Sequence, residues 1–229
     1  MSEVTGQPAP AFRLVVFDCD GTLVDSFAAM HEAMAAACEE CGQAPPTPAQ
    51  HRAVMGIPPR LQMQRFFPRL DEARHQPIID AFFRHVRGAA LVEPLYPGVA
   101  DTLRRLDAAG WLMGVATAKT SRGLHKNLAD HGLRHRFLTL QTIDSNASKP
   151  NPEMVLKAMA ALGVAAANTV MIGDSIYDME MARHAGVVPL GVAWGYHDAK
   201  SLTASGARAI APDFASLPAL LAELMPCAS

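Results

Sequence analysis

A chain of 229 residues, half of them hydrophobic, can bury a substantial core, so we expect a folded globular protein. The formal charge of −2 at pH 7 lacks the basic excess typical of nucleic-acid binding, so we expect a small-molecule substrate and no nucleic-acid partner. The longest uncharged apolar stretch, residues 158–167, is shorter than the roughly 18 to 20 residues that span a bilayer. The start, Met1-Ser2-Glu3, shows no signal-peptide pattern, so we expect a cytoplasmic protein without membrane association.

The first predicted element is a buried strand over residues 14–17, which runs directly into Asp18-Cys19-Asp20-Gly21-Thr22. In open α/β sheets ligands bind beyond the carboxyl ends of the strands, so Asp18 and Asp20 are expected at the mouth of a crevice. Carboxylates this close repel each other, and a divalent cation such as Mg²⁺, which prefers oxygen ligands, would relieve that repulsion. The alternative is that both acids are helix caps or solvated turn residues.

Residues 25–93 show helical segments separated by prolines and no convincing buried strand. A helix is predicted over residues 27–41, with Asp25 or Ser26 as its N-cap. The predicted breaks are Pro45-Pro46, Pro58-Pro59, Pro68 and Pro77. We therefore expect a small α-helical domain inserted after the first strand.

The chain has four cysteines, too few for a disulfide framework at this length, so we expect reduced thiols. Cys38 and Cys41 have the spacing of a redox or zinc motif. Because no second pair accompanies them and helix-forming residues surround them, we interpret both as structural thiols.

From residue 97 onward, helix and strand patterns alternate. Helices are predicted over residues 99–109, 121–130, 152–162, 176–184 and 217–224, and strands over 112–117, 137–140, 169–172 and 187–192. This alternation predicts an α/β fold with a doubly wound parallel sheet and helices on both faces. The expected domains are a catalytic core of residues 1–24 and 94–229 and an α-helical cap of residues 25–93.

Polar residues follow several of these strands, so they should gather at one edge of the sheet. Thr117 ends the second strand, Asp174 follows the strand over residues 169–172, and Lys149 arrives on a loop. The Thr117 hydroxyl and the Lys149 ammonium suit phosphoryl oxygens, and Asp174 together with Asp18 could hold Mg²⁺. Taken singly, Thr117 and Asp174 also fit helix caps, and Lys149 fits an ordinary loop lysine.

In chain order, the polar motifs resemble the four motifs of the haloacid dehalogenase-like hydrolase superfamily. They are Asp18-Cys-Asp20-Gly-Thr-Leu-Val-Asp25, Thr117, Lys149-Pro150 and Gly173-Asp174-Ser175-Ile-Tyr-Asp178. The resemblance spans residues 13–195, and the helical insertion resembles the α-helical cap of the phosphoglycolate phosphatase and β-phosphoglucomutase branch. It implies a Rossmann-like core with an inserted cap.

The resemblance also implies roles in catalysis. Asp18 attacks phosphorus to form an aspartyl-phosphate, and Asp20 first protonates the leaving oxygen and then activates water. The Asp18 and Asp174 carboxylates and the backbone carbonyl of Asp20 surround Mg²⁺. Asp178, one helical turn beyond Asp174, orients Lys149 or a metal-bound water.

Substrate contacts are expected from Thr117, Ala118, Lys149 and, in the cap, Arg60, which is suited to an anionic substrate end. The function implied is a Mg²⁺-dependent phosphatase acting on a small phosphorylated metabolite, 2-phosphoglycolate or a sugar phosphate, as a monomer or homodimer. The cap is expected to close about hinges near residues 24–25 and 93–94.

Three other functions share part of the pattern. A phosphomutase of the β-phosphoglucomutase type has all four motifs and stays open as an alternative. A haloacid dehalogenase fits less well because it lacks an acid matching Asp20, and a phospho-accepting receiver module has a different motif order. Residues 117–120 imitate the end of a nucleotide P-loop but lack its glycines.

Overall fold

The computed structural model describes residues 12–88 and 92–226, and its core is a six-stranded parallel sheet in the order β3-β2-β1-β4-β5-β6. The strands are β1 (Arg13–Phe17), β2 (Trp111–Thr117), β3 (Thr139–Thr142), β4 (Thr169–Gly173), β5 (Val188–Val192) and β6 (Ala209–Ala211). The order reverses beside β1, so the residues that follow β1 lie at a topological switch point. The predicted doubly wound α/β fold is confirmed.

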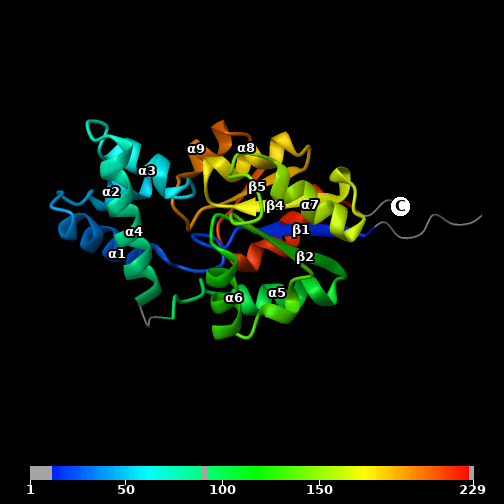
Figure 1. Ribbon diagram of the computed structural model, residues 1–229. Helices are drawn as coiled ribbons and strands as arrows, with labels where there is room; N and C mark the ends of the chain where they lie inside the picture. The colour runs from blue at the N-terminus through cyan, green and yellow to red at the C-terminus, as the bar shows by residue number, and fades with distance from the viewer. Residues whose placement is uncertain (1–11, 89–91, 227–229) are drawn as a thin grey trace, which may run out of the picture.

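Side-chain alternation along the strands explains the two layers of helices. Val15 and Phe17 of β1 point into one hydrophobic cluster, and Leu14 and Val16 point into another on the opposite face. The helices of the core are α5 (Val99–Ala108), α6 (Ser121–Asp130), α7 (Glu153–Leu162), α8 (Ile176–His184), α9 (Ala199–Ala204) and α10 (Leu217–Leu224). Helices α5, α6 and α10 cover the first cluster, and α7 and α8 cover the second (Figure 1).

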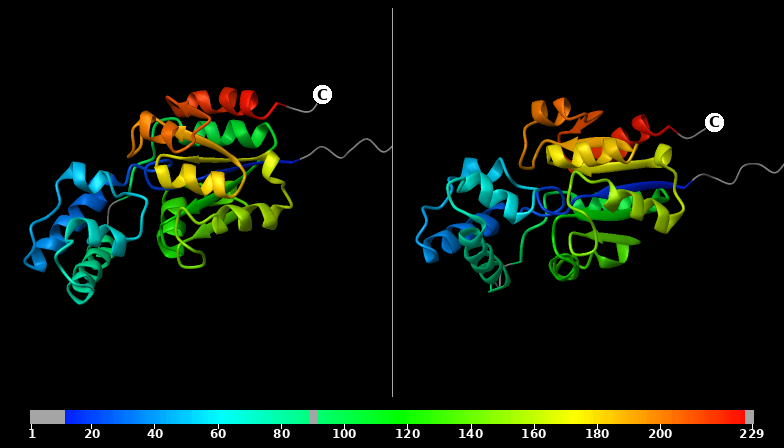
Figure 2. Two further views of the ribbon diagram at one scale, coloured as in Figure 1. Left: turned by 90° about the horizontal axis from the view of Figure 1, so that it is seen from above. Right: turned by 45° about the horizontal axis from the view of Figure 1, so that its top comes forward.

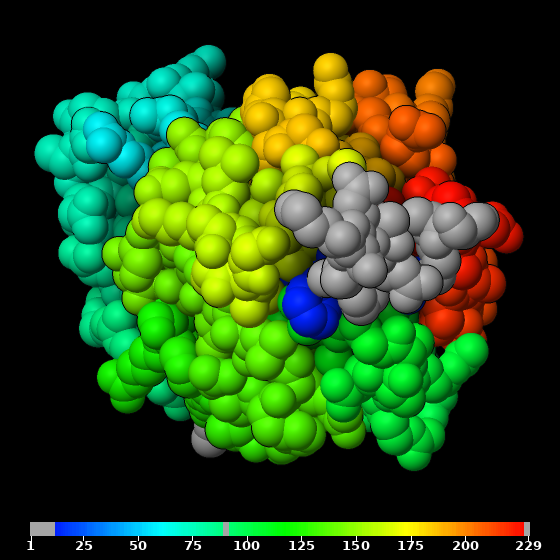
Figure 3. All heavy atoms as spheres, turned by 90° about the vertical axis from the view of Figure 1, so that its right-hand side faces the viewer, coloured from blue at the N-terminus to red at the C-terminus, as the bar shows by residue number. Residues whose placement is uncertain are grey.

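Several core elements differ from their predicted ranges by one or two residues, and the largest shift is in β3. β3 begins at Thr139, two residues later than predicted, and Phe137 packs in the hydrophobic core just before the strand. The short elements α9 and β6 were not predicted. Viewed from the side on which β1 begins, the cap residues appear at one margin of the molecule (Figure 3).

The helical insertion consists of α1 (Phe27–Glu40), α2 (Pro48–Arg52), α3 (Pro59–Phe66) and α4 (Glu72–Gly88), which we call the cap (residues 27–88). Its own hydrophobic cluster includes Met34, Met63, Ile78 and Phe82. The cap lies beyond the carboxyl end of β1 (Figure 2). The break predicted at Pro77 is wrong: Pro77 lies inside α4, near its start.

The two connections between core and cap run side by side. Val24 and Leu95 form an antiparallel bridge, and the Asp25 amide donates to the Pro94 carbonyl at 2.8 Å. The predicted domain ranges include residues 1–11, 89–91 and 227–229, which lie outside the described residues, and the boundaries stay predictions. Within the described ranges, no helix is both long and apolar enough to cross a membrane.

Candidate active site

Asp18 follows β1 at the centre of the sheet edge and is almost fully buried. Its amide donates to the Ile172 carbonyl at 2.9 Å and so extends the ladder between β1 and β4 by one residue. The chain then turns tightly, and the Leu23 and Val24 amides both donate to the Cys19 carbonyl. This geometry holds the Asp18 carboxylate at the switch point of the sheet.

Lys149 joins two of the buried acids. Its Nζ lies 2.8 Å from Oδ1 of Asp18 and 2.7 Å from Oδ1 of Asp178. Burial alone would lower the pKa of Lys149, but the charges of Asp178 and Asp18 outweigh it and hold the pKa above its ordinary value. The ammonium is therefore a fixed positive charge beside Asp18.

Asp174 follows β4, and protein groups donate to both of its carboxylate oxygens. Oδ1 accepts from the Thr22 hydroxyl at 2.9 Å, and Oδ2 accepts from the Tyr196 amide at 2.9 Å. The loop after β5 approaches so closely that a Cβ on Gly195 would lie 2.0 Å from the Cβ of Asp174. Sequence reasoning missed Gly195 and Tyr196, although a glycine shortly after a strand that ends at this edge was a usable signal.

Asp178 has two roles: it caps α8 and it holds Lys149. Its Oδ2 accepts from the Ser175 amide at 3.1 Å, while the Ser175 Oγ accepts from the Asp178 amide at 3.2 Å, which forms a capping box on α8. The other carboxylate oxygen holds Lys149. The helix start thereby fixes the orientation of the lysine.

Oxygen atoms of Asp18, Asp174 and Asp178 all lie within 4.8 Å of one another, and we call these residues the acid cluster. Burial raises the pKa of Asp18 to about 7, with Lys149 opposing the rise and Asp178 adding to it. Burial, followed by the charges of Asp18 and Asp178, raises the pKa of Asp174 well above its usual range. Three carboxylates against one ammonium leave excess negative charge, and this set of hard oxygen donors fits Mg²⁺.

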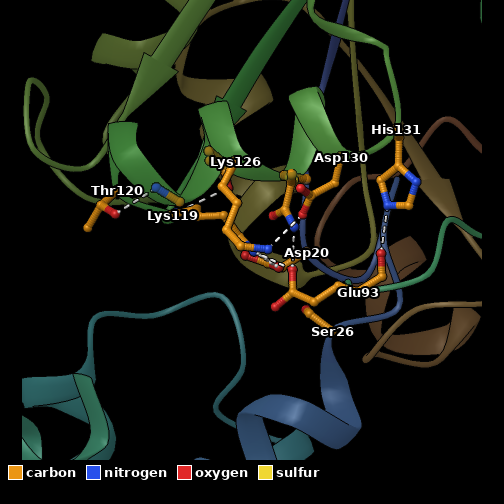
Figure 4. Close-up of polar contacts among 12 residues, drawn as sticks. Asp20, Ser26, Glu93, Lys119, Thr120, Lys126, Asp130 and His131 are labelled. Carbon is orange, nitrogen blue, oxygen red and sulfur yellow. Dashed lines mark hydrogen bonds and ion pairs between the residues drawn. The ribbon is translucent and has the colours of Figure 1, made fainter. Parts of the chain in front are cut away.

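The carboxylate of Asp20 points to a different partner. Its Oδ1 lies 2.8 Å from Nζ of Lys119, a residue that sequence reasoning considered only as part of a false P-loop (Figure 4). Thr117 is buried at the end of β2, and its Oγ1 accepts from the Lys119 amide at 3.2 Å, with Ala118 between them. The cap of α6 is Thr120, whose hydroxyl accepts from the Gly123 amide.

Arg60 is not brought to this cluster. It lies at the exposed start of α3, where its partner among the described residues is Glu72, so its role as a substrate ligand stays a prediction. A different cap arginine contacts the core: Nη1 of Arg65 donates to the Tyr177 hydroxyl at 3.1 Å.

The cap packs on the core next to the acid cluster. Phe27 and Met55 form a small apolar cluster with Tyr196, whose amide holds Asp174. Ser26, at the N-cap position of α1, directs its hydroxyl to that of Tyr196 at 2.8 Å. One core residue therefore contacts both the acid cluster and the first helix of the cap.

Comparison with known proteins identifies relatives along most of the chain. A family model described as haloacid dehalogenase-like hydrolase matches residues 15–192. A phosphoglycolate phosphatase of Agrobacterium fabrum is 32% identical over 223 residues, covering 94% of this chain and 95% of the relative. A Dickeya dadantii protein named Probable phosphatase IndB is 31% identical over 213 residues, with coverages of 89% and 91%.

Solved structures show the same architecture. The crystal structure of a predicted phosphoglycolate phosphatase from Haemophilus somnus superimposes with a TM-score of 0.83 and 24% identity, covering 91% of this chain and 97% of the other. A predicted phosphatase from Clostridium acetobutylicum has a TM-score of 0.84 at 23% identity, with coverages of 93% and 99%. At these identities the similarity shows the fold alone.

Proposed function

The chain belongs to the haloacid dehalogenase-like hydrolase family and is a phosphatase, and from this we propose that it hydrolyses a small phosphorylated metabolite in a Mg²⁺-dependent reaction. The leading substrate is 2-phosphoglycolate, because relatives with that activity in their names match most of the chain. A sugar phosphate is the other candidate. The free thiols of Cys19, Cys38 and Cys41 support a cytoplasmic location.

The observation that carries the proposal is the pairing of Asp18 with Lys149 at the switch point. Oδ1 of Asp18 accepts from the Cys19 amide at 2.7 Å and lies 2.8 Å from the lysine, and we assign the attack to Oδ2. A bond forms between this oxygen and phosphorus while the bond from phosphorus to the leaving oxygen breaks. Water then cleaves the aspartyl-phosphate and regenerates the carboxylate.

Asp18 and Asp174, with the backbone carbonyl of Asp20, are the groups we assign to Mg²⁺. When bound, the ion supplies positive charge that offsets the repulsion between a carboxylate and a phosphate dianion. Asp178 keeps Lys149 beside Asp18 from the start of α8. This division explains why three buried acids lie together and two of them contact one lysine.

The remaining residues bind the phosphoryl group and move protons. We assign the Thr117 hydroxyl, the Ala118 amide and the Lys149 ammonium to the phosphoryl oxygens. Asp20 protonates the leaving oxygen and later takes a proton from the attacking water. Cap closure over the acid cluster would exclude bulk water during both steps.

The test is a screen of phosphorylated metabolites with and without Mg²⁺, read as released phosphate. Asp18→Asn should abolish turnover, since an amide is a poor nucleophile, and Asp20→Asn should cost at least ~10²-fold through lost acid–base assistance. Asp101→Asn, at an exposed position of α5, is the matched control and should leave the rate unchanged.

Two outcomes would contradict the assignment. Turnover by Asp18→Asn at the rate of the unmodified protein would remove the nucleophile from the proposal. Conversion of a hexose 1-phosphate to the 6-phosphate without released phosphate would identify a phosphomutase instead.

A further inference from the structure

Lys119 lies between the proposed acid–base residue and a segment that leads to the cap. It follows β2 in a loop, and only 8% of its side chain is exposed. Its Nζ lies 2.8 Å from Oδ1 of Asp20 and 2.7 Å from Oε2 of Glu93 (Figure 4). One ammonium therefore holds two carboxylates from distant parts of the chain.

The Glu93 end of this bridge is fixed to α6. The Asn127 side-chain amide donates to the same Oε2 at 2.8 Å, and Nε2 of His131 lies 2.7 Å from the Glu93 carbonyl oxygen (Figure 4). The next residue, Pro94, accepts from the Asp25 amide of the other connection. The bridge consequently joins Asp20 to both connections between core and cap.

Burial makes this arrangement depend on its charges. Only 8% of the Lys119 side chain, 19% of the Asp20 side chain and 11% of the Glu93 side chain are exposed, so water screens these ion pairs little. Removing one member of such a group leaves a buried charge without its partner. The three side chains therefore behave as one unit.

We infer that Lys119 is a positioning residue that ties the orientation of the Asp20 carboxylate to the position of the cap connection at Glu93, an inference that rests on the proposed role of Asp20. Because Lys119 holds Oδ1, the other oxygen of Asp20 is turned toward the leaving group. Glu93 lies at the predicted hinge, so a cap movement that shifts its carboxylate would act on the same Nζ. Proton transfer at Asp20 is thus coupled to the position of the cap.

If the bridge served stability alone, replacing Lys119 would leave kcat of the folded enzyme unchanged. Lys119→Met should lower kcat by about ten- to hundredfold, as expected for a misplaced catalytic group, with KM changed by less than about threefold. Lys119→Arg keeps the charge and should recover most of kcat. Lys126→Met is the matched control, since Lys126 forms an exposed pair with Asp130 on α6 and should leave both constants unchanged (Figure 4).

A double-mutant cycle tests whether Glu93 acts through the lysine. Glu93→Gln alone should reduce kcat by less than Lys119→Met, and the double variant should fall no further than Lys119→Met by itself. Additive losses would overturn the coupling, as would an unchanged kcat in Lys119→Met.

Amide hydrogen exchange gives a readout that does not need turnover. The amides of Asp25 and Tyr96 donate across the paired connections, at 2.8 Å and 3.1 Å, and Lys119→Met should speed their exchange while Lys126→Met does not. If the unmodified protein releases phosphate from no ester, the proposed function fails, and exchange still decides whether Lys119 holds the connections. If phosphate is released but neither kcat nor exchange changes in Lys119→Met, the inference alone fails.

Discussion

Glycines leave the space that the carboxylates of the acid cluster occupy. A Cβ on Gly21 would lie 2.3 Å from Oδ2 of Asp174, and one on Gly173 would lie 2.4 Å from Cγ of Asp178. Gly21 also has a φ of +80°, so both its conformation and its surroundings favour glycine. The positions of the Asp174 and Asp178 carboxylates therefore depend on glycines, which have no side chain.

Replacing Gly195 by Ala should displace Asp174, because the new Cβ would collide with the side chain of that acid. We expect activity to fall by about tenfold or more and the Mg²⁺ dependence to shift to higher concentration. The measurement is phosphate release against Mg²⁺ concentration. Gly88→Ala is the control, since a Cβ there would have no described atom within 4 Å. Equal Mg²⁺ curves for both variants would refute this account of Gly195.

Among the elements, α2 is held to α1 by a buried aromatic group. His51 packs against Phe27 and Phe66, with ring centroids 5.9 Å and 5.8 Å away, and its Nδ1 lies 3.2 Å from Nδ1 of His31. Burial, and then the nearby His31, lower the pKa of His51 to about 4, with a hydrogen bond from the imidazole to Gln62 opposing the shift. A neutral imidazole is therefore part of the cap's packing.

This shift makes the stability of the protein depend on pH. Above about pH 6.5 the imidazole is neutral in both states, but between about 6.5 and 4 only the unfolded chain gains the proton. Stability should fall by up to about 3 kcal/mol as the pH drops through this window. Denaturant unfolding should show a flatter pH profile for His51→Phe, whereas the exposed His135→Gln should match the unmodified protein. Identical slopes in all three proteins would contradict the assignment.

At the scale of the whole molecule, the acid cluster opposes folding until a cation binds. Three buried carboxylates lie close together where the sheet faces the cap, and one ammonium contacts two of them. A ligand at 100 times its Kd stabilises the folded state by about 2.7 kcal/mol. The proposed Mg²⁺ site would therefore also make stability depend on the ion.

Mg²⁺ should raise Tm by roughly 5 to 10 °C under those conditions, and chelation should reverse the change. Asp174→Asn can keep the Tyr196 and Thr22 hydrogen bonds while losing a charge, so its Tm without Mg²⁺ should rise and its response to Mg²⁺ should vanish. Thermal unfolding followed by circular dichroism measures both. A full Mg²⁺ response in Asp174→Asn would exclude this carboxylate as a ligand.

Much of the fold could be predicted because local signals agree with it. The ranges of α6 and α8 match the prediction, since each starts at a capping residue, Thr120 and Ser175, before a periodic apolar pattern. The strand β6 is only three residues long and carries too little pattern to be recognised. Pro77 misled the prediction because α4 buries Ile78 and Phe82 in the cap's hydrophobic cluster, and this packing offsets the cost of a proline inside the helix.

In the site too, the residues that follow strands could be predicted, and those that act through long-range contacts could not. Asp18 and Asp174 were predicted to converge because both follow strands of one parallel sheet, and Lys149 lies between Asp18 and Asp178 as the motifs implied. Lys119 and Tyr196 were missed because their importance arises from contacts with residues far away in sequence. Such contacts depend on loop paths that hydrophobic periodicity does not encode.

The pairing of Asp25 with Pro94 has a consequence for how this architecture can diversify. The chain leaves and re-enters the sheet at adjacent points, so excising the intervening helices would leave two ends that a short turn could join at little entropic cost. A different domain inserted at the same junction would approach the crevice from the same direction. Replacing the cap by another inserted domain would then change which substrates reach the crevice. Phosphoryl transfer would still depend on the residues that follow the strands.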